Sequence, residues 1–405
     1  MKPYSTHILS NGIRFLYHQT QSPVLYVSWG VSAGSAQERI FGTAHFCEHL
    51  MFTGTHRFPN YDEALLALGA TNNAWTDQDH TVYDVEAPPN TLKEIISIES
   101  DRWNNLKTQL QTSQFLREKQ VIINERREYF DTNPLEKWEE RNPSDLFGSA
   151  HPYGHPIIGT EQSILNISIL DIQAYLRQWY HPSNTVVCIA GQDDEADVLE
   201  ELNASWGQYT STTAFVKENI PVLSAPKNQK TSIHLANTPP MICWQWLCHV
   251  KHTGPAEVIA LLLSSSQYGI LHRELVLNQH LAISVQAFVR EHPTMSILEL
   301  RIELSDESKR DQVYAYVHEV LENIQSLTTP SMLHKIQKKI RLQWYMECEE
   351  IENFKDLLLC WNLYHDTPLA DRMQAMLNLK QKELEDCMSW ICTQNPLESH
   401  CYEET

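Results

Sequence analysis

Three side chains in one short segment have the types and spacing of a metal site with a base beside it. His45 and His49 stand four residues apart, and Glu48 follows His45 by three. On a helix, positions four apart lie on one face, one turn from each other, so both imidazoles can reach one metal ion. Glu48 falls near the same face. A carboxylate there can take a proton from water while the metal polarises a carbonyl group.

A second helix offers candidates for the remaining ligand. A catalytic zinc site usually has three protein ligands and one open position, so two histidines do not complete it. Glu118 and Glu125 lie in a helical pattern at about 113–130 and are seven residues apart. Because two helical turns separate them, they share a face. One can bind the metal, and the other can hydrogen-bond a ligating histidine.

The five-residue motif taken alone leaves alternatives open. Its order, H-x-x-E-H, is that of the inverted zinc peptidases, but a chain with 19 histidines can also match it by chance. Cys47 points about 200° round the helix from His45, so we expect it to face the core. The run His-Pro-Tyr-Gly-His at 151–155 contains Pro and Gly, which predicts a loop rather than a second metal site.

The elements that must hold these residues alternate between strands and helices. Short apolar or β-branched runs bounded by turn residues predict strands, and longer periodic segments predict helices. In the first half we expect strands at 24–31, 72–85 and 185–191, the second of these a strand or hairpin, and helices from about 43, 60, 91 and 113. In the second half we expect strands at 242–250, 283–289 and 296–304, and helices from about 256 and 311.

A polar stretch with weak periodicity, at about 209–230, separates two α/β halves of similar size. We place a zinc-bearing domain at 1–215, a linker at 216–230 and a second domain without metal at 231–405. The halves show no sequence repeat strong enough to prove duplication.

The composition narrows the partners. The 405 residues include 31 Lys and Arg against 51 Asp and Glu, a formal net charge of −20. Such an acidic chain does not suit nucleic acid, and it fits cationic substrates or simple solubility. The N-terminus has no signal-like apolar stretch and no segment is long enough to span a bilayer, so we expect a cytoplasmic protein without a membrane partner. Nine cysteines without a C-x-x-C pair indicate reduced core thiols.

With these motifs in place, the chain resembles the pitrilysin-like (M16) zinc peptidases, which include insulin-degrading enzyme and the mitochondrial processing peptidases. The matching segments follow one another in order over about the first 200 residues, and the second half resembles the family only in layout. The matches lie at 9–14, 42–49, 51–55, 73–76, 118–125, 151–154, 159–160 and 180–191.

The resemblance implies a role for each candidate. His45, His49 and Glu125 would be the ligands of Zn²⁺, since the offset of 76 residues from His49 to Glu125 fits the third ligand of the family. Glu48 would be the general base and Glu118 an acid that contacts a ligand from outside the metal's own shell. The implied fold is α+β, with two similar halves, each a mainly antiparallel sheet packed with helices.

The resemblance also implies that 73–76, Asn-Ala-Trp-Thr, lies at an exposed sheet edge that captures an extended peptide, with Asn73 and Ala74 binding the substrate. Such strand addition recognises main-chain hydrogen bonds more than side chains. The alternative for this segment is an ordinary buried hairpin.

One departure from the family pattern bears on partners. Family enzymes complete the active site with an Arg and a Tyr seven residues apart in the second half, which suit stabilisation of an oxyanion. Our alignment puts Val276 and Ile283 at these positions, and neither side chain donates a hydrogen bond. Arg273 and His280 have the same spacing but need a less natural alignment. We therefore expect a heterodimer in which a homologous subunit carries the Arg/Tyr pair, or otherwise a homodimer.

The expected function is that of an HxxEH-type zinc metalloendopeptidase, a hydrolase that cleaves peptides or unfolded segments inside a closed chamber as the catalytic subunit of a heterodimer. Three alternatives stay open: a non-catalytic structural subunit of a peptidase-like complex, a self-sufficient homodimeric peptidase, and a zinc enzyme of other chemistry. The first is disfavoured because loss of activity would remove the need for His45, Glu48, His49 and Glu125, all of which are present.

Overall fold

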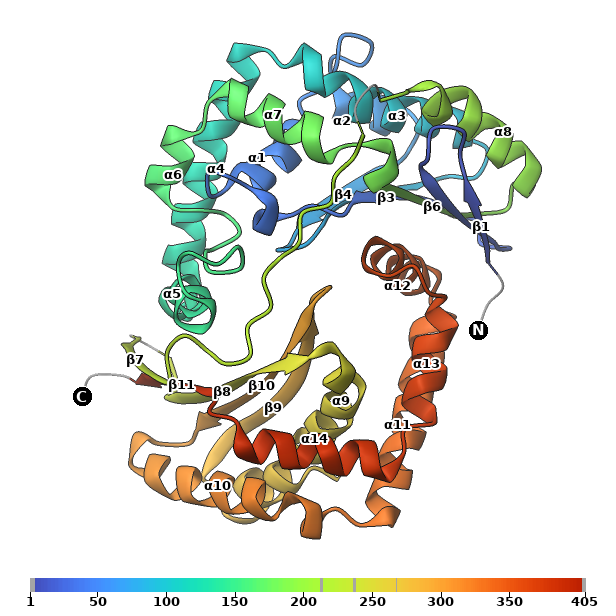
Figure 1. The fold of residues 1–405 in the computed structure, drawn as a ribbon. Helices are drawn as coiled ribbons and strands as arrows, with labels where there is room; N and C mark the ends of the chain where they lie inside the picture. Colours follow the sequence, from blue (N-terminus) through green and yellow to red (C-terminus); the bar gives the residue numbers. More distant parts are fainter. Residues whose placement is uncertain (1–3, 212–213, 236–237, 267, 403–405) are drawn as a thin grey trace. The chain divides into compact units, whose positions relative to one another are not determined.

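The computed structural model describes residues 4–211, 214–235, 238–266 and 268–402. Two compact units are interleaved along the chain (Figure 1). The first unit takes Met1–Glu128, Pro156–Asn219 and Met346–Leu369, and the second takes Tyr129–His155, Ile220–Tyr345 and Ala370–Thr405. Each unit combines segments that are far apart in the sequence, whereas the domain boundaries proposed above divide the chain into consecutive stretches. Those boundaries therefore stay a prediction.

The first unit is built on a six-stranded sheet with the order β1-β2-β6-β3-β5-β4. Neighbouring strands are antiparallel except for β2 and β6, which are parallel. The expected strands and the hairpin are confirmed, and β4 lies at the edge of the sheet. The strands are β1 (Ser5–Ile8), β2 (Arg14–Gln19), β3 (Leu25–Val31), β4 (Thr71–Thr76), β5 (Thr81–Ala87) and β6 (Thr185–Gly191).

Helices pack against the face of this sheet that carries Trp29 and Tyr83. The side chains of Trp29 and Tyr83 point into the main core there and are fully buried. The helices expected from 43, 60, 91 and 113 are all confirmed. The helices of this unit that lie before residue 346 are α1 (Thr43–Leu50), α2 (Tyr61–Leu66), α3 (Leu92–Gln109), α4 (Thr112–Thr132), α6 (Glu161–Asn166), α7 (Ile169–Trp179) and α8 (Glu195–Ser205).

A helix from late in the chain, α12 (Ile351–Tyr364), covers the other face of the first sheet. Gly30, the last residue but one of β3, permits this approach, because a Cβ atom there would lie 2.9 Å from Leu363 Cδ1. Lys355 of α12 is buried and forms ion pairs with Asp84 of β5 at 3.0 Å and with Asp356 at 2.9 Å. The central strands β3 and β6 are therefore covered on both faces.

The second unit has a five-stranded sheet with the order β7-β11-β8-β10-β9. Its strands are β7 (Lys230–His234), β8 (Met241–His249), β9 (Ala282–Glu291), β10 (Met295–Leu304) and β11 (Leu397–Tyr402). Its helices are α5 (Glu136–Phe147), α9 (Thr253–Ser264), α10 (Arg310–Leu327), α11 (Pro330–Glu349), α13 (Leu369–Leu377) and α14 (Gln381–Thr393), with a π-helix, η5, at His272–Asn278.

The two sheets share one topology. If β1 is set aside, the order β2-β6-β3-β5-β4 becomes β7-β11-β8-β10-β9 when each strand number is raised by five. The parallel pair also corresponds, since β2 pairs with β6 and β7 with β11. The expectation of two similar halves, each with a mainly antiparallel sheet, is confirmed.

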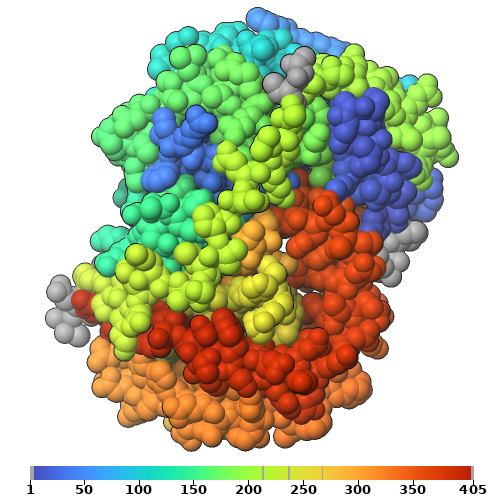
Figure 2. Space-filling view, in the orientation of Figure 1, coloured from blue at the N-terminus to red at the C-terminus, as the bar shows by residue number. Residues whose placement is uncertain are grey.

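A surface segment, the state of the cysteines and the character of the helices concern both units. Residues 214–229 contain no helix or strand, are mostly exposed, and run along the surface (Figure 2). All nine cysteines are free, and seven of them are buried. In the described part of the chain, no helix combines the length and the apolar character that a membrane crossing requires.

Candidate metal centre and catalytic base

The start of α1 is fixed by a partly buried acid. Gly42, with φ 94°, precedes the helix, and a Cβ at this position would lie 2.7 Å from the carbonyl oxygen of Ile158. The Glu38 carboxylate accepts hydrogen bonds from the backbone N–H groups of Gly42 at 2.7 Å and Ala44 at 2.9 Å. A carboxylate at a helix N-terminus satisfies free N–H groups and complements the helix dipole. The helix that carries His45 therefore has a defined position.

His45, His49 and Glu125 come together where α1 faces α4. One possible ligand atom from each lies within 4.8 Å of the others, and this is the one such group of His, Cys, Asp and Glu among the residues described. Glu125 lies 3.6 Å from Nε2 of His45 and 3.0 Å from Nε2 of His49. Both imidazoles thus direct their Nε2 atoms to the Glu125 carboxylate. The four-residue spacing of His45 and His49 predicts this common direction.

The protonation states differ between the two histidines. Burial lowers the pKa of His45 to about 4, so its imidazole is neutral at pH 7 and offers a lone pair. Burial also acts to lower the pKa of His49, but the hydrogen bond and charge of Glu125 outweigh it and the pKa is raised. For Glu125, burial is outweighed by His49, so its pKa is lowered and it is ionised.

These residues fit a zinc ion. Two imidazole nitrogens and one carboxylate oxygen are a common ligand set of catalytic zinc. The ionised carboxylate supplies negative charge, and the neutral imidazole of His45 supplies an unprotonated nitrogen. All three side chains keep some exposure, from 13% for His45 to 45% for Glu125, so the site is open to solvent.

Glu48 is held beside this group by the edge strand. The hydroxyl of Thr76, the last residue of β4, donates a hydrogen bond of 2.5 Å to Oε2 of Glu48. Burial raises the pKa of Glu48, while the Thr76 hydrogen bond and His49 oppose this shift. A carboxylate with a raised pKa that stays within reach of water is suited to accept and return a proton.

Glu118 lies on the outer side of His49. Its Oε2 is 3.9 Å from Nδ1 of His49, and its Oε1 accepts a hydrogen bond of 2.9 Å from Arg117. The separation from His49 is longer than a hydrogen bond, so the role of an acid that orients a ligating histidine stays a prediction.

β4 presents a free edge next to Glu48. Among the strands of the described residues it pairs with β5 alone, and the side chains of Asn72 and Asn73 are exposed. The N–H of Ala74 donates to Oδ1 of Asn73 at 2.9 Å rather than to a neighbouring strand, so it faces the open edge. The buried-hairpin alternative is therefore wrong for β4, whose first three residues are exposed.

The two pairs considered for the oxyanion role lie in the second unit. Val276, in η5, is partly buried against the core, and Ile283, in β9, is 55% exposed. Arg273 and His280 are both exposed, and His280 has a φ of 53° with its Nδ1 at 2.9 Å from the carbonyl oxygen of Val276.

Two expectations about other residues are confirmed. Cys47 is fully buried in the core. The run at 151–155 forms a loop, in which Nε2 of His151 lies 2.9 Å from the carbonyl oxygen of Pro221.

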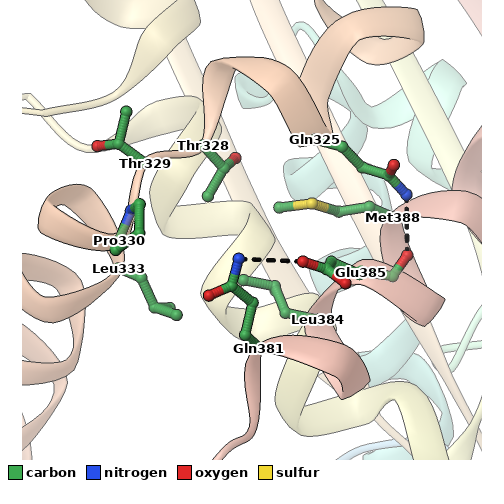
Figure 3. A pocket seen from close by; sticks show the side chains of 9 residues that line it. All are labelled: Gln325, Thr328, Thr329, Pro330, Leu333, Gln381, Leu384, Glu385 and Met388. Carbon is green, nitrogen blue, oxygen red and sulfur yellow. Dashed lines mark hydrogen bonds between the residues drawn. The ribbon is translucent and has the colours of Figure 1, made fainter.

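A small pocket also lies in the second unit, between α10, α11 and α14 (Figure 3). Its polar side chains bond to one another or to nearby groups. Figure 3 shows Gln381 donating to Glu385 at 3.0 Å and Gln325 donating to the backbone carbonyl oxygen of Glu385 at 3.2 Å. Gln325 also donates to Ser389 at 2.6 Å. The remaining lining side chains offer hydroxyl or apolar groups but no metal ligand or base.

Two contacts of the site were not predicted. The sequence indicates peptide capture for the segment that contains Thr76 and gives Glu38 no role. Glu38 lies four residues before the N-cap residue Gly42, and Glu is not a preferred N-cap type, so no local pattern identifies its contacts. The Thr76 contact joins residues 28 positions apart and follows only from the fold.

Fold and site together define a member of the zinc-peptidase-like α+β proteins with an inverted H-x-x-E-H helix. A sequence profile described as insulinase (peptidase family M16) matches residues 14–161, and one described as peptidase M16 inactive domain matches residues 166–340. The chain belongs to peptidase family M16, which confirms the resemblance seen in its motifs.

Individual known proteins are similar to this chain in sequence. The chain is 28% identical over 235 residues to the probable zinc protease PqqL of Escherichia coli K12, covering 54% of this chain and 23% of that protein. It is 28% identical over 200 residues to the mitochondrial-processing peptidase subunit beta of Dictyostelium discoideum, covering 48% of this chain and 42% of that protein. The chain thus spans less than half the length of these two relatives.

Among solved structures, a protease from Helicobacter pylori is similar along the whole chain. The TM-score is 0.87 at 20% identity, and the match covers 99% of this chain and 100% of that one. The likeness shows a shared two-half fold.

Proposed function

We propose that this protein is a zinc-dependent endopeptidase that hydrolyses peptides or unfolded segments. The observation that carries the proposal is the meeting of His45, His49 and Glu125 within 4.8 Å, with Glu48 held one residue from His49 on the same helix. The relatives named as zinc proteases and peptidases support the same chemistry.

The chain's own residues divide the work. His45, His49 and Glu125 would hold the ion, which when bound would supply Lewis acidity toward a water molecule and a peptide carbonyl. Glu48 takes the proton from the attacking water and later gives it to the leaving amine. The Thr76 hydrogen bond fixes one carboxylate oxygen of Glu48, which leaves the other free for the water. Glu118 orients His49.

The open edge of β4 would bind the substrate as an added strand. The N–H of Ala74 faces this edge, and a peptide carbonyl would replace Oδ1 of Asn73 as its acceptor. Since Thr76 ends the same strand, the bound peptide would run toward Glu48. Main-chain recognition of this kind selects extended segments, so peptides and unfolded chains are the expected substrates.

We further propose that the chain works with a homologous subunit. Neither Val276 nor Ile283 donates a hydrogen bond to an oxyanion, so the donors would come from a partner that carries an Arg/Tyr pair. A relative named as the beta subunit of a processing peptidase is in keeping with shared active sites. The alternative is a homodimer.

The test is cleavage of a mixed set of quenched peptides by the zinc-loaded chain, alone and with candidate homologous subunits. We expect the Glu48→Gln variant to lose activity by about 10²- to 10⁴-fold, while its zinc content stays that of the wild type. Glu63→Gln, which changes an exposed residue of α2, is the matched control and should be unaffected.

The outcomes separate the parts of the proposal. Activity of the chain alone that is lost in Glu48→Gln would establish the peptidase and contradict the need for a partner. Zinc binding without cleavage, with or without candidate partners, would argue against the peptidase itself. Cleavage that remains in Glu48→Gln would remove Glu48 from the mechanism.

A further inference from the structure

A second cluster of reactive side chains lies on the first unit, away from the metal ligands. It joins the turn between β4 and β5 to α12, and its members are Asp77, His80, Cys360 and Tyr364. The proposed peptidase chemistry uses none of them. Cys360 and Tyr364 lie 280 and 284 residues after His80 in the sequence, so only the packing of α12 on the sheet brings the cluster together.

The imidazole of His80 is held between two groups. Its Nδ1 lies 3.0 Å from Oδ2 of Asp77 and 2.6 Å from the hydroxyl oxygen of Tyr364. The Tyr364 hydroxyl also donates to Oδ2 of Asp77 at 3.2 Å. With Nδ1 engaged in this way, the orientation of the ring is fixed and Nε2 is left for another partner.

That partner is a thiol. Sγ of Cys360 lies 3.8 Å from Nε2 of His80, within the range of a hydrogen bond to sulfur. Cys360, His80 and Asp77 thus contact one another in the order nucleophile, base and carboxylate that orients the base. Catalytic cysteine sites have the same order. Cys360 is also partly exposed, whereas seven of the other eight cysteines are buried.

The charge on the imidazole favours reactivity. Burial acts to lower the pKa of His80, but the charge and hydrogen bond of Asp77 outweigh it and raise the pKa to about 10. The imidazole is therefore a cation at pH 7, and its Nε2–H points to the sulfur. A protonated imidazole directed at a cysteine sulfur is typical of reactive cysteine sites.

We propose that Cys360, His80 and Asp77 form a reactive-thiol site, and that Cys360 is the cysteine of this chain that electrophiles and hydroperoxides modify first. With a hydroperoxide, the sulfur attacks the O–O bond; an S–O bond forms and the O–O bond breaks. The sulfur is oxidised by two electrons to a sulfenic acid, and the peroxide is reduced. His80 delivers the proton to the departing oxygen, which leaves as water or an alcohol.

Cys392 provides an internal reference for this proposal. It is exposed, but its Sγ donates to the carbonyl oxygen of Leu321 at 3.0 Å. Burial and the charge of Glu322 raise its pKa. If exposure alone decided reactivity, Cys392 would react before Cys360. If the cationic imidazole of His80 decides reactivity, Cys360 reacts before Cys392.

The experiment is timed alkylation of the folded wild-type chain with iodoacetamide at pH 7, followed by peptide mass spectrometry. We expect Cys360 to react at least about tenfold faster than Cys392. Treatment with hydrogen peroxide and a 1,3-diketone trap should label the same residue first. Equal rates, or faster labelling of Cys392, would overturn the proposal without the need for any variant.

Variants then test the role of the imidazole. His80→Asn should slow alkylation of Cys360 by at least about tenfold and leave Cys392 unchanged. Tyr364→Phe is a milder second variant for the case that His80→Asn does not fold; it keeps the ring, and it should leave Cys360 the faster thiol because Asp77 still holds the imidazole. An unchanged Cys360 rate in folded His80→Asn would contradict the assignment.

Discussion

The two sheets of this protein have the same strand order once β1 is set aside, yet among the described residues only the first unit holds a group of candidate metal ligands. In the first unit, the connection from β3 to the edge strand β4 contains α1 with its two histidines and a glutamate. In the second unit, the corresponding connection from β8 to the edge strand β9 contains α9 and η5. α9 is mostly apolar and, among its residues, offers Glu257 alone as a possible metal ligand. One topology thus holds either a site or a core helix, and the side chains decide which.

The units also treat their charges differently. In the second sheet the fully buried Glu299 is paired with Arg290 and Arg301, and Arg372 is paired with Glu257 and Glu291. In the first unit, Glu125 and His49 face each other while 45% and 21% of their side chains stay exposed. Burial alone does not separate the two kinds of site, since Glu257 and Glu291 keep 22% and 21% exposure, close to the 21% of His49. The difference lies in the partners: these carboxylates face an arginine, whereas Glu125 faces two imidazoles whose nitrogens can also bind a metal.

The first prediction concerns α12, which has the largest expected effect. Lys355→Ala would leave Asp84 and Asp356 without their buried cation, so we expect a loss of about 3 to 5 kcal/mol in the free energy of unfolding. Urea denaturation followed by tryptophan fluorescence measures it. Lys382→Ala, on an exposed position of α14, should change stability by less than about 0.5 kcal/mol. Equal effects would mean that α12 is not needed to cover the first sheet.

The second prediction uses pH. The folded pKa of His80, about 10, lies above its ordinary value of 6.5 because of Asp77. A raised pKa means that the contribution to stability is complete below pH 6.5 and is lost as the pH rises toward 10. We expect the wild type to lose on the order of 4 kcal/mol more than His80→Gln across this interval. Parallel curves for the two proteins would show that the Asp77–His80 pair does not contribute.

The third prediction tests the outer side of the metal site. Glu118→Gln should lower zinc affinity by about 10- to 100-fold, because the carboxylate that faces Nδ1 of His49 loses its charge. Competition with a chromogenic chelator measures the affinity. Glu257→Gln, the matched change in the second unit, should leave it unaffected. If both variants bind zinc like the wild type, Glu118 has no part in the site.

The smallest expected effect concerns the hydroxyl that holds Glu48. Thr76→Val keeps the shape of the side chain but removes the hydrogen bond, so kcat should fall about tenfold with KM little changed. Thr76→Ser should retain most of the activity. Peptide cleavage, in whichever assembly is active, provides the test. A loss confined to KM would instead place Thr76 in substrate binding alone.

Local patterns made much of the fold predictable. The helix that carries His45, the hairpin at 72–85 and the strand at 185–191 have periodicity and turn residues that are read within a short window. The spacing of His45 and His49 indicated a shared metal because a helix fixes which residues face the same way. The choice of Glu125 rather than Glu118 as the third ligand came from the family resemblance alone. The strands β7 and β11 were not expected, as both are short and begin or follow polar stretches.

Long-range packing was not predictable in the same way. Nothing in the sequence near Lys355 or Cys360 shows that α12 belongs with a sheet formed by the first 200 residues. A lysine within a helix is usually exposed, yet Lys355 is buried because its partner Asp84 lies on β5. The Thr76–Glu48 contact and the Cys360–His80 contact depend on the same tertiary arrangement.

The central claim is that His45, His49 and Glu125 hold a zinc ion, and zinc content tests it most directly. Wild type and Glu48→Gln should each bind one zinc ion per chain after dialysis, measured by plasma emission spectrometry, since Glu48 is not a ligand. His49→Gln should lower the affinity by more than about 100-fold, beyond the effect expected of a residue outside the ligand set. Equal zinc retention in wild type and folded His49→Gln would contradict the account.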